Sequence, residues 1–339
     1  MKLLYLASHV TMEYDELSLF SALGIDCFSV GAYIDPQNPI QINRKPLGIL
    51  PKPELINNFK SLNPKYQLGS GDCKLSKELV KDFDVVFVSH NITYVKKNWD
   101  VLKDKFCIWR TFGQGGAGYE QFINTLRPNF KIVRTSPKEL LRPKNIGADA
   151  IIRASCDPEE FKDWNGSKLE VLTAQKHMQT IPWNTDFVFY EEVTRPFART
   201  LMGLNNQKTP FAVSNLSYEE LLQRYRDARV YYSSCSKAGH YTYTFMEAWM
   251  TGTPVVTIGP DRGDAHYPSF EQHELIENGV TGFWSDDKKT LQGHIRELLD
   301  NEQLAAQISA MGRKRAIELF GFDNIKQEWK EFFQNYGLL

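Results

Sequence analysis

The chain of 339 residues exceeds the length at which a single hydrophobic core usually stops growing, so we expect two domains. A hydrophobic content of 42% and a charged content of 24% are ordinary for a soluble globular protein. The formal net charge of −1 gives no overall reason to expect a nucleic-acid or membrane partner, so only a local patch could bind either.

Five cysteines are scattered along the chain without a CxxC pair or a paired histidine spacing, which indicates neither a disulfide framework nor a zinc site. A reducing compartment fits best, and we expect a cytoplasmic protein, either free or peripheral at a membrane. The apolar run in MKLLYLASHV ends at Ala7. It is too short for a signal-peptide core or a membrane span and predicts a first strand.

Four segments in the first half predict strands, and the first of them is a continuous apolar run typical of a strand buried on both faces. They are Leu3–Ala7, Phe83–Ser89, Phe106–Trp109 and Lys131–Ser136. Loops that leave such strands meet at the carboxyl edge of a sheet, and the polar candidates there are His9, His90, Arg110 and Gln114. Residues 35–71 are rich in Pro, Asn, Lys and Gly with little periodicity, which predicts an extended connection or an insertion.

Two features after the third strand suggest an anion, and each has an equally simple structural explanation. Gly113, Gly115, Gly116 and Gly118 could let backbone N–H groups approach an anion, or could form a flexible turn before a helix. From residue 127 to 153, seven basic residues face only two acids. This excess could bind an anionic lipid, a phosphorylated intermediate or DNA, or it could be a solvated positive face.

A strand–helix–strand unit from Arg229 to Gly259 organises the second half. Arg229–Ser234 and Pro254–Gly259 are rich in β-branched and aromatic residues, whereas Thr244–Met250 holds good helix formers and Gly252 stands where a helix would end. We also expect a strand at Leu169–Thr173, a helix at Leu216–Asp227 with a Ser217–Glu220 capping box, two helices in Lys289–Phe320 and a last helix at Phe322–Tyr336.

The loop between the first strand and the helix of this unit predicts a nucleotide site. The helix that follows would present unpaired N–H groups and its positive dipole end to a phosphate, with Thr242 and Thr244 as caps. One turn further along, the Glu247 carboxylate can accept hydrogen bonds from both hydroxyls of a ribose. An ordinary buried crossover is the alternative.

At these residues the sequence resembles a known family. FMEAWMTGTPVV, followed by ELIENGVTGFWSDD at Glu274–Asp287, resembles the donor-binding half of the retaining glycosyltransferases of family four. The resemblance implies a GT-B fold, with two Rossmann-like α/β domains facing each other across a cleft. Residues 1–166 would bind the acceptor, residues 167–320 would bind the nucleotide sugar, and a helix in 321–339 would cross back to the first domain.

The resemblance also implies roles for single residues. A sugar would pass from a UDP- or GDP-linked donor to an acceptor hydroxyl with retention, and the chain would need no cofactor. We expect no metal to be required. Gly239 replaces the first acid of the family's Glu-x7-Glu pair. The implied catalytic residues are Glu247, Lys176 and His90; the implied donor contacts are Gly239, His240, Thr242, Tyr243, Thr244, Glu247 and Lys176; the implied acceptor contacts are His9, His90, Arg110 and Gln114.

Three alternatives stay open. A nucleotide-sugar epimerase would turn over the donor without an acceptor. A non-catalytic binding protein with the same fold would bind a nucleotide without transferring a sugar. A DNA-modifying glycosyltransferase acting on hydroxymethylated bases would use the basic segment from Arg127 to Arg153 and would bind DNA in a salt-sensitive way.

Overall fold

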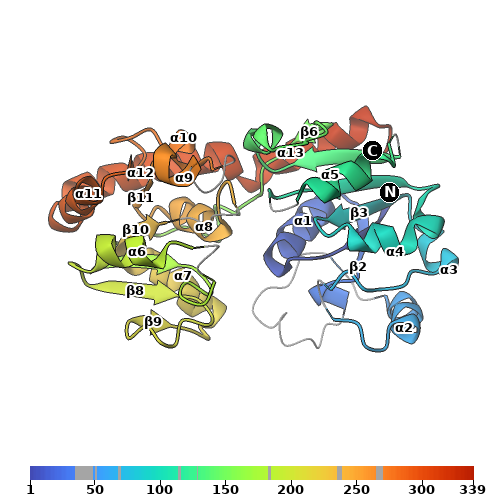
Figure 1. The fold of residues 1–339 in the computed structure, drawn as a ribbon, viewed down its shortest axis with the longest axis horizontal. Coiled ribbons are helices and arrows are strands. Elements are labelled where there is room, and N and C mark those ends of the chain that lie inside the picture. Colours follow the sequence, from blue (N-terminus) through green and yellow to red (C-terminus); the bar gives the residue numbers. More distant parts are fainter. Residues whose placement is uncertain are drawn as a thin grey trace. The chain divides into compact units, whose positions relative to one another are not determined.

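The computed structural model divides the chain into two compact units, shown as a ribbon in Figure 1. Unit 1 comprises Met1–Ser155 and Asp323–Leu339, and unit 2 comprises Cys156–Phe322. The structure describes residues 1–34, 49, 52–67, 70–113, 116–127, 129–181, 185–234, 239–264 and 270–339. Among these residues, no helix combines the length and the apolar character needed to cross a bilayer.

Unit 1 is built on a parallel sheet of six strands in the order β2-β1-β3-β4-β5-β6. The strands are β1 (Lys2–Leu6), β2 (Asp26–Ser29), β3 (Val85–Ser89), β4 (Phe106–Arg110), β5 (Phe130–Arg134) and β6 (Ala150–Ile151). The four strands predicted in this half are confirmed as β1, β3, β4 and β5. They are almost wholly buried, which is why they read as continuous apolar runs.

The sequence analysis predicted the last of the helical segments of unit 1 and missed most of the others. The segments are α1 (Val10–Ala22), η1 (Ala32–Ile34), α2 (Pro53–Leu62), α3 (Lys77–Val80), α4 (Thr93–Leu102), α5 (Ala117–Asn124), η3 (Pro137–Leu141) and α13 (Phe322–Asn335). Helix α2 lies within residues 35–71, where an extended connection or an insertion was predicted, and the extended connection is wrong for the residues of this helix. Its only fully buried side chain is Phe59, and a proline opens it, so its composition resembles that of a loop.

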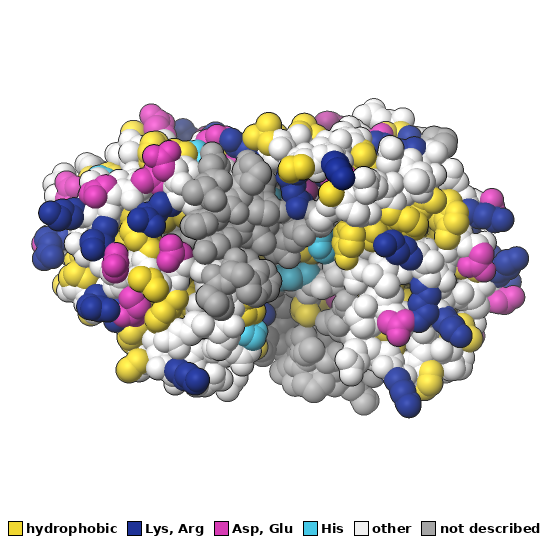
Figure 2. Space-filling model, in the orientation of Figure 1, with side chains coloured by type: hydrophobic (Ala, Val, Ile, Leu, Met, Phe, Trp, Pro, Cys, Tyr) yellow, Lys and Arg dark blue, Asp and Glu magenta, His cyan; other side chains and the backbone are white. Residues whose placement is uncertain are grey.

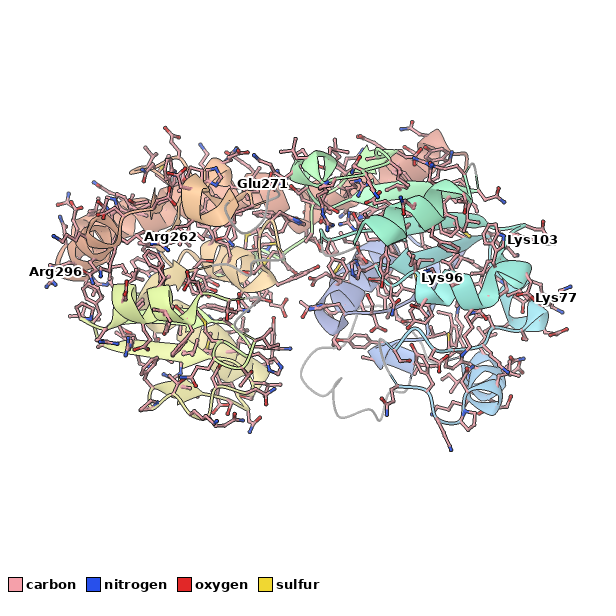
Figure 3. The ribbon with its side chains drawn as sticks, viewed as in Figure 1. Lys77, Lys96, Lys103, Arg262, Glu271 and Arg296 are labelled. Atoms are coloured by element: carbon pink, nitrogen blue, oxygen red, sulfur yellow. The ribbon has the colours of Figure 1, made fainter. Side chains whose placement is uncertain are left out.

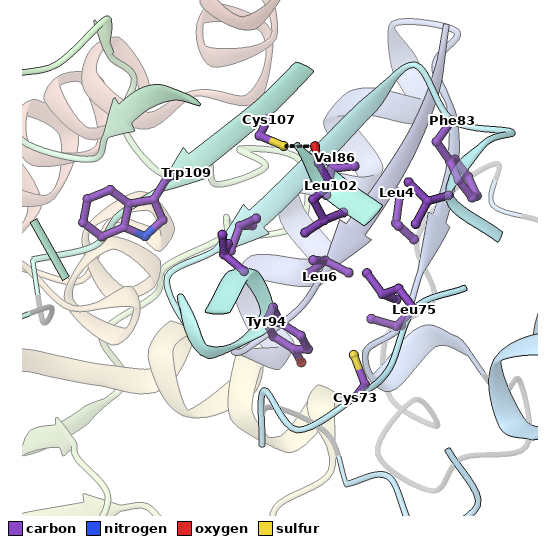
Figure 4. Close-up of a cluster of buried hydrophobic side chains, with 14 of the residues drawn as sticks. Leu4, Leu6, Cys73, Leu75, Phe83, Val86, Tyr94, Leu102, Cys107 and Trp109 are labelled. Carbon is purple, nitrogen blue, oxygen red and sulfur yellow. Dashed lines mark hydrogen bonds between the residues drawn. The ribbon is translucent and has the colours of Figure 1, made fainter. Parts of the chain in front are cut away.

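Apolar side chains from β1, β3, β4 and α4 form the core on one side of the unit 1 sheet, as Figure 4 shows. Leu4, Leu6 and Val86 come from the strands, and the Cys107 thiol donates to the carbonyl oxygen of Leu102 on α4. Helix α13 packs elsewhere on unit 1, where Trp329 meets Phe20 and Phe87 edge-on or tilted at 5.2 and 5.6 Å between ring centroids.

Unit 2 has a second parallel sheet of six strands in the order β12-β11-β10-β7-β8-β9. The strands are β7 (Lys168–Ala174), β8 (Arg199–Met202), β9 (Ala212–Val213), β10 (Ala228–Ser233), β11 (Val255–Ile258) and β12 (Phe283–Ser285). The three strands predicted here are confirmed as β7, β10 and β11. Strands β10 and β11 are parallel neighbours, as the predicted crossover requires.

The helices of unit 2 follow the predicted signals closely. They are α6 (Phe187–Thr194), α7 (Tyr218–Asp227), α8 (Tyr243–Thr251), α9 (Pro260–Asp264), α10 (Gln272–Leu275), α11 (Lys288–Asp300) and α12 (Glu302–Phe320). The capping box of Ser217 and Glu220 is formed at the start of α7. Gly252 ends α8 with φ of 97°, a left-handed conformation that glycine adopts at little cost.

Candidate functional site

Both sheets reverse their strand order once, and the candidate residues lie beside these two switch points. In unit 2 the chain builds outward from β7 through β8 and β9, then returns to place β10 on the other side of β7. In unit 1 it builds from β1 to β2, then returns to place β3 on the other side of β1. Parallel α/β sheets bind ligands at the carboxyl ends of the strands that flank such a reversal.

At the unit 2 switch point, threonines connect the start of α8 to the end of β7. The Thr242 hydroxyl accepts a hydrogen bond from the Phe245 N–H at 3.2 Å and thereby caps the helix. The Thr244 hydroxyl donates to the carbonyl oxygen of Ala174, the last residue of β7, at 3.0 Å. No acidic side chain lies in the first turn of α8. The positive end of this helix therefore faces the switch point without a carboxylate of its own.

The loop after β7 carries Lys176 and is held by one buried amide. Asn206 accepts a hydrogen bond from the Met178 N–H at 2.8 Å and donates to the Gln175 carbonyl oxygen at 2.7 Å. Its side chain thus spans the two residues that enclose Lys176 and His177. The Lys176 side chain is exposed and His177 has φ of 58°. The fold fixes the backbone at Lys176 and leaves its ammonium group toward solvent.

Glu247 lies one turn into α8 and is only 8% exposed. Its Oε2 atom accepts a hydrogen bond of 3.0 Å from the hydroxyl of Tyr225 on α7. A carboxylate with so little exposure needs hydrogen-bond donors to remain charged, and Tyr225 supplies one.

Gly239 and His240, at the end of the loop after β10, are buried as well. The His240 carbonyl oxygen accepts from the N–H of Glu271, which Figure 3 labels, at 2.9 Å. This bond ties the loop to the segment that leads into α10. The preceding residues 235–238 lie outside the described residues. Tyr243, the first residue of α8, is half-buried beside the Thr242 cap.

At the unit 1 switch point, His9 follows β1 and His90 follows β3. The two strand ends are joined because the Ser8 hydroxyl donates to the carbonyl oxygen of Ser89 at 2.6 Å. Phe112 lies near both histidines, with its ring centroid 6.3 Å from that of His9 and 4.3 Å from that of His90. Two imidazoles that are 81 residues apart in the chain therefore flank one aromatic ring.

His90 has an unusual backbone conformation and a lowered pKa. Its φ is 58°, which is uncommon for any residue other than glycine and marks a position fixed by its surroundings. Burial lowers the pKa of His90 from 6.5 to about 4, while nearby Glu139 raises the pKa and Arg142 lowers it. The Nδ1 atom is shielded and makes no hydrogen bond with any described residue. His90 is thus a neutral imidazole at neutral pH.

Arg110 is bonded inside unit 1. Its guanidinium, on a side chain only 1% exposed, donates to Glu16 and to the carbonyl oxygens of Arg134, Ile152 and Arg153. These bonds use both terminal nitrogens and Nε. Arg110 therefore holds strands together from inside unit 1. Gln114 lies outside the described residues, so the structure does not place it.

Gly113, the first glycine of the cluster, lies beside a buried carboxylate, and Gly115 lies outside the described residues. Glu139 is fully buried and accepts from the Thr111 hydroxyl at 2.5 Å, from the Gly113 N–H at 3.0 Å and from the Thr135 N–H and hydroxyl. Gly113 has φ of 78°, which only glycine adopts readily. The Gly113 N–H group is therefore used inside unit 1, which favours the turn over the anion-binding loop.

The basic segment loses part of its excess charge to internal partners. Arg134 is fully buried and forms a bidentate pair with Glu120, at 3.0 and 2.9 Å. Arg127 pairs with Asp149 at 2.5 Å. Figure 2 shows basic and acidic side chains interspersed on the visible face rather than gathered by sign. The count of charged residues from 127 to 153 overstates the positive charge of this segment, because Glu120, which pairs with Arg134, lies outside it.

Three residues that sequence reasoning missed take part in these arrangements: Tyr225, Asn206 and Phe112. Tyr225 lies within a predicted helix, where periodicity indicates that it is buried but not what its hydroxyl contacts. Asn206 lies in a turn, where asparagine is common for many reasons. Phe112 offered the clearest signal, because an aromatic residue within RTFGQGG follows directly after a strand.

No protein-family model matches the sequence, and no curated protein matches it. Solved structures do match. The Anabaena protein HepE in complex with UDP-glucose superposes with a TM-score of 0.69 at 14% identity, covering 99% of this chain and 100% of that one. A glycosyltransferase from Rickettsia africae gives 0.68 at 14%, covering 98% of each chain. An alpha-glucosyltransferase in complex with UDP gives 0.66 at 11%, covering 98% and 99%. The chain therefore has the two-domain α/β GT-B fold, with Rossmann-like units.

Proposed function

We propose that this protein is a glycosyltransferase that moves a sugar from a UDP-linked donor to an acceptor hydroxyl, with unit 2 as the donor domain and unit 1 as the acceptor domain. The observation that carries the proposal is the unit 2 switch point, where the start of α8 is bonded to the end of β7 and Glu247 lies one turn further in. The similar structures solved with UDP or UDP-glucose support a uridine nucleotide over a guanosine nucleotide.

The donor diphosphate would lie against the first turn of α8. The helix N-terminus and the hydroxyl groups of Thr242 and Thr244 favour an anion there. Lys176, on the loop that Asn206 fixes, would add a full positive charge. These groups matter most as negative charge develops on the leaving diphosphate, since interactions stronger in the transition state are those that accelerate a reaction. They offset that charge without requiring a metal.

The Glu247 carboxylate would accept hydrogen bonds from the ribose hydroxyls. The loop residues Gly239 and His240 would line the same edge of the unit 2 sheet, with Tyr243 beside them. Gly239 stands where the family has an acid, so a group other than this residue must hold the donor sugar. Retention of the anomeric configuration is part of the proposal on the basis of the family resemblance.

The acceptor would bind at the unit 1 switch point, on the ring of Phe112 and between His9 and His90. His90 is neutral at working pH because burial holds its pKa at about 4. It would therefore act on an acceptor hydroxyl through a hydrogen bond or as a base, and not as a cation. Arg110 is not part of the proposed site, because its guanidinium is buried and bonded within unit 1.

The test is calorimetric binding of UDP and GDP to the wild-type protein and to Glu247→Ala, followed by turnover of UDP-glucose with and without candidate acceptors. We expect UDP to bind and its affinity to fall about tenfold, or ~1.4 kcal/mol, in the variant. Failure of both nucleotides to bind would remove the proposal's main support. Donor turnover to a new sugar nucleotide without an acceptor would indicate an epimerase, and binding without any transfer would indicate a non-catalytic protein.

DNA is the second candidate acceptor, and one observation favours it. An alpha-glucosyltransferase solved with UDP-glucose and DNA containing an abasic site superposes with a TM-score of 0.64 at 11% identity, covering 98% of this chain and 99% of that one. Lys138, Arg142 and Lys144 would be the basic residues to meet a phosphate backbone. Binding of a hydroxymethylated duplex that weakens steeply with added salt would support this acceptor, whereas salt-independent or absent binding would exclude it.

A further inference from the structure

Tyr225 is a fully buried tyrosine whose hydroxyl meets the carboxylate of Glu247. The oxygen-to-oxygen distance is 3.0 Å, and the Tyr225 side chain is not exposed at all. Burial, and then the neighbouring Glu247 charge, raises the pKa of the Tyr225 hydroxyl well above its usual value of 10. The hydroxyl therefore stays protonated at any working pH and donates its hydrogen bond to the carboxylate.

Tyr225 is also fixed relative to α8 from its backbone. Its carbonyl oxygen accepts a hydrogen bond of 2.7 Å from the hydroxyl of Thr253, which follows directly after α8 and its Gly252 end. Its ring lies among two other aromatic rings, 6.5 Å from that of Phe161 and 6.1 Å from that of Tyr231. Since both its carbonyl and its hydroxyl are bonded to residues at α8, the tyrosine has no freedom to swing away.

We infer that Tyr225 is a positioning residue that orients the Glu247 carboxylate toward a ribose 2′,3′-diol, and that it thereby makes the site select ribonucleoside over 2′-deoxyribonucleoside diphosphates. The inference rests on the proposed function, because it assumes that Glu247 contacts the donor ribose. A carboxylate offers about four acceptor positions. Tyr225 occupies one on Oε2, so it sets the rotation of the carboxyl plane for whatever the others accept.

Selection between the two sugars follows from the low exposure of Glu247. A site that hydrogen-bonds a ligand hydroxyl rejects an analogue without it, because the buried polar group then loses a partner. That rejection depends on a fixed carboxylate. A carboxylate free to rotate would bind a 3′-hydroxyl alone nearly as well as a diol.

The experiment measures calorimetric affinities of UDP and 2′-deoxy-UDP for the wild type, Glu247→Gln, Tyr225→Phe and Tyr232→Phe. Tyr232 is the matched control, because it is an equally buried tyrosine on β10 whose hydroxyl has no hydrogen-bond partner among the described residues. We expect the wild type to prefer UDP, and Glu247→Gln to lose most of that preference. Tyr225→Phe should lower the ratio of the two affinities about tenfold through weaker UDP binding, and Tyr232→Phe should leave the ratio unchanged.

The outcomes separate the inference from the function on which it rests. If the wild type does not bind UDP, the proposed function fails and the inference fails with it. If Glu247→Gln loses the preference and Tyr225→Phe keeps it, Glu247 binds the ribose and only the role of Tyr225 is overturned. If Tyr225→Phe does not fold, Thr253→Val takes its place in the experiment. This variant removes the hydrogen bond to the Tyr225 carbonyl oxygen and leaves the Tyr225 hydroxyl in the protein. A lower ratio then supports the inference, and an unchanged ratio overturns it.

Discussion

The helices that start near the two switch points differ in their acidic residues. In each unit a helix starts close behind the strand end, α1 after β1 and α8 after β10. Helix α1 is capped by the His9 ring and buries three acidic side chains, Glu13, Asp15 and Glu16. Helix α8 is capped by Thr242 and has no acid in its first turn. The first turn of α1 thus contains the acidic Glu13, whereas the first turn of α8 contains no acidic residue.

This difference indicates which half suits a diphosphate. In unit 1, Glu13 accepts hydrogen bonds from the Ser29 hydroxyl and from the N–H groups of Ala32 and Tyr33. Gly31 is required beside it, because a Cβ atom there would lie 2.3 Å from the Glu13 carboxyl oxygens. An added anion would be repelled by such a group when it is charged. We therefore expect the diphosphate at the start of α8 rather than at the start of α1.

The largest expected effect comes from breaking the buried charge pair of unit 1. Arg110→Met removes the partner of Glu16 and leaves three carbonyl oxygens without their donor. We expect a destabilisation of about 3–5 kcal/mol, the usual result of leaving a buried charge uncompensated. Urea unfolding followed by the fluorescence of unit 1 tryptophans measures it. The exposed Lys103→Met, labelled in Figure 3, is the control and should cost little. A loss below about 1 kcal/mol would contradict the structural role of Arg110.

A second, smaller effect concerns the diphosphate side. Lys176→Ala should lower the turnover number about 100-fold, or ~2.7 kcal/mol, because its charge is proposed to act on the leaving group. Lys208→Ala removes another exposed lysine of unit 2 and should leave turnover unchanged. Steady-state kinetics with UDP-glucose measures both. An equal loss of turnover in the two variants would show that Lys176 contributes only to the overall positive potential of unit 2 and not to the leaving group.

Next in size is a pH effect confined to unit 1. The folded pKa of His90, at about 4, lies below its unfolded value, so this group stabilises the fold above pH 6.5 and the contribution is lost as the pH falls toward 4. Burial raises the pKa of Glu13 from 4.5 to about 7, so its contribution is present below pH 4.5 and lost as the pH rises through 7. The two contributions oppose each other over the same range.

Variants separate the two groups. Glu13→Gln should become more stable, relative to wild type, as the pH rises from about 4.5 to about 7, and His90→Asn should become less stable over that range. Asparagine is chosen because it tolerates a positive φ. Melting temperatures of the three proteins at several pH values give the answer. If the melting temperatures of the wild type and both variants changed with pH in parallel, neither Glu13 nor His90 would have a shifted pKa in the folded protein.

The smallest expected effect compares the two helix caps. Thr242→Ala should destabilise unit 2 by about 1 kcal/mol and also weaken UDP binding, since the hydroxyl caps α8 at the proposed phosphate site. Thr242→Ser keeps the hydroxyl and should behave as wild type. His9→Ala removes the α1 cap, a longer contact of 3.4 Å, and should leave UDP affinity unchanged. If Thr242→Ala and His9→Ala changed the UDP affinity equally, the start of α8 would have no greater role in UDP binding than the start of α1.

The sequence alone determined the fold class, twelve of the strands and helices, and the two strand ends where the histidines lie. It did so because buried parallel strands are continuous apolar runs, and because caps such as Ser217 and Gly252 act within a few residues. Residues 53–62 were missed because a short, mostly exposed helix leaves no apolar stripe to detect.

Only the tertiary structure decided which polar side chains are bonded inside the protein. Arg110 ends a buried strand and His90 follows one, yet the first is bonded to Glu16 and three carbonyl oxygens, while the ring of the second lies beside that of Phe112. The pairing of Tyr225 with Glu247, and of Thr244 with the end of β7, joins residues 22 and 70 positions apart. Such contacts depend on which strands become neighbours, and local sequence pattern carries no information about that.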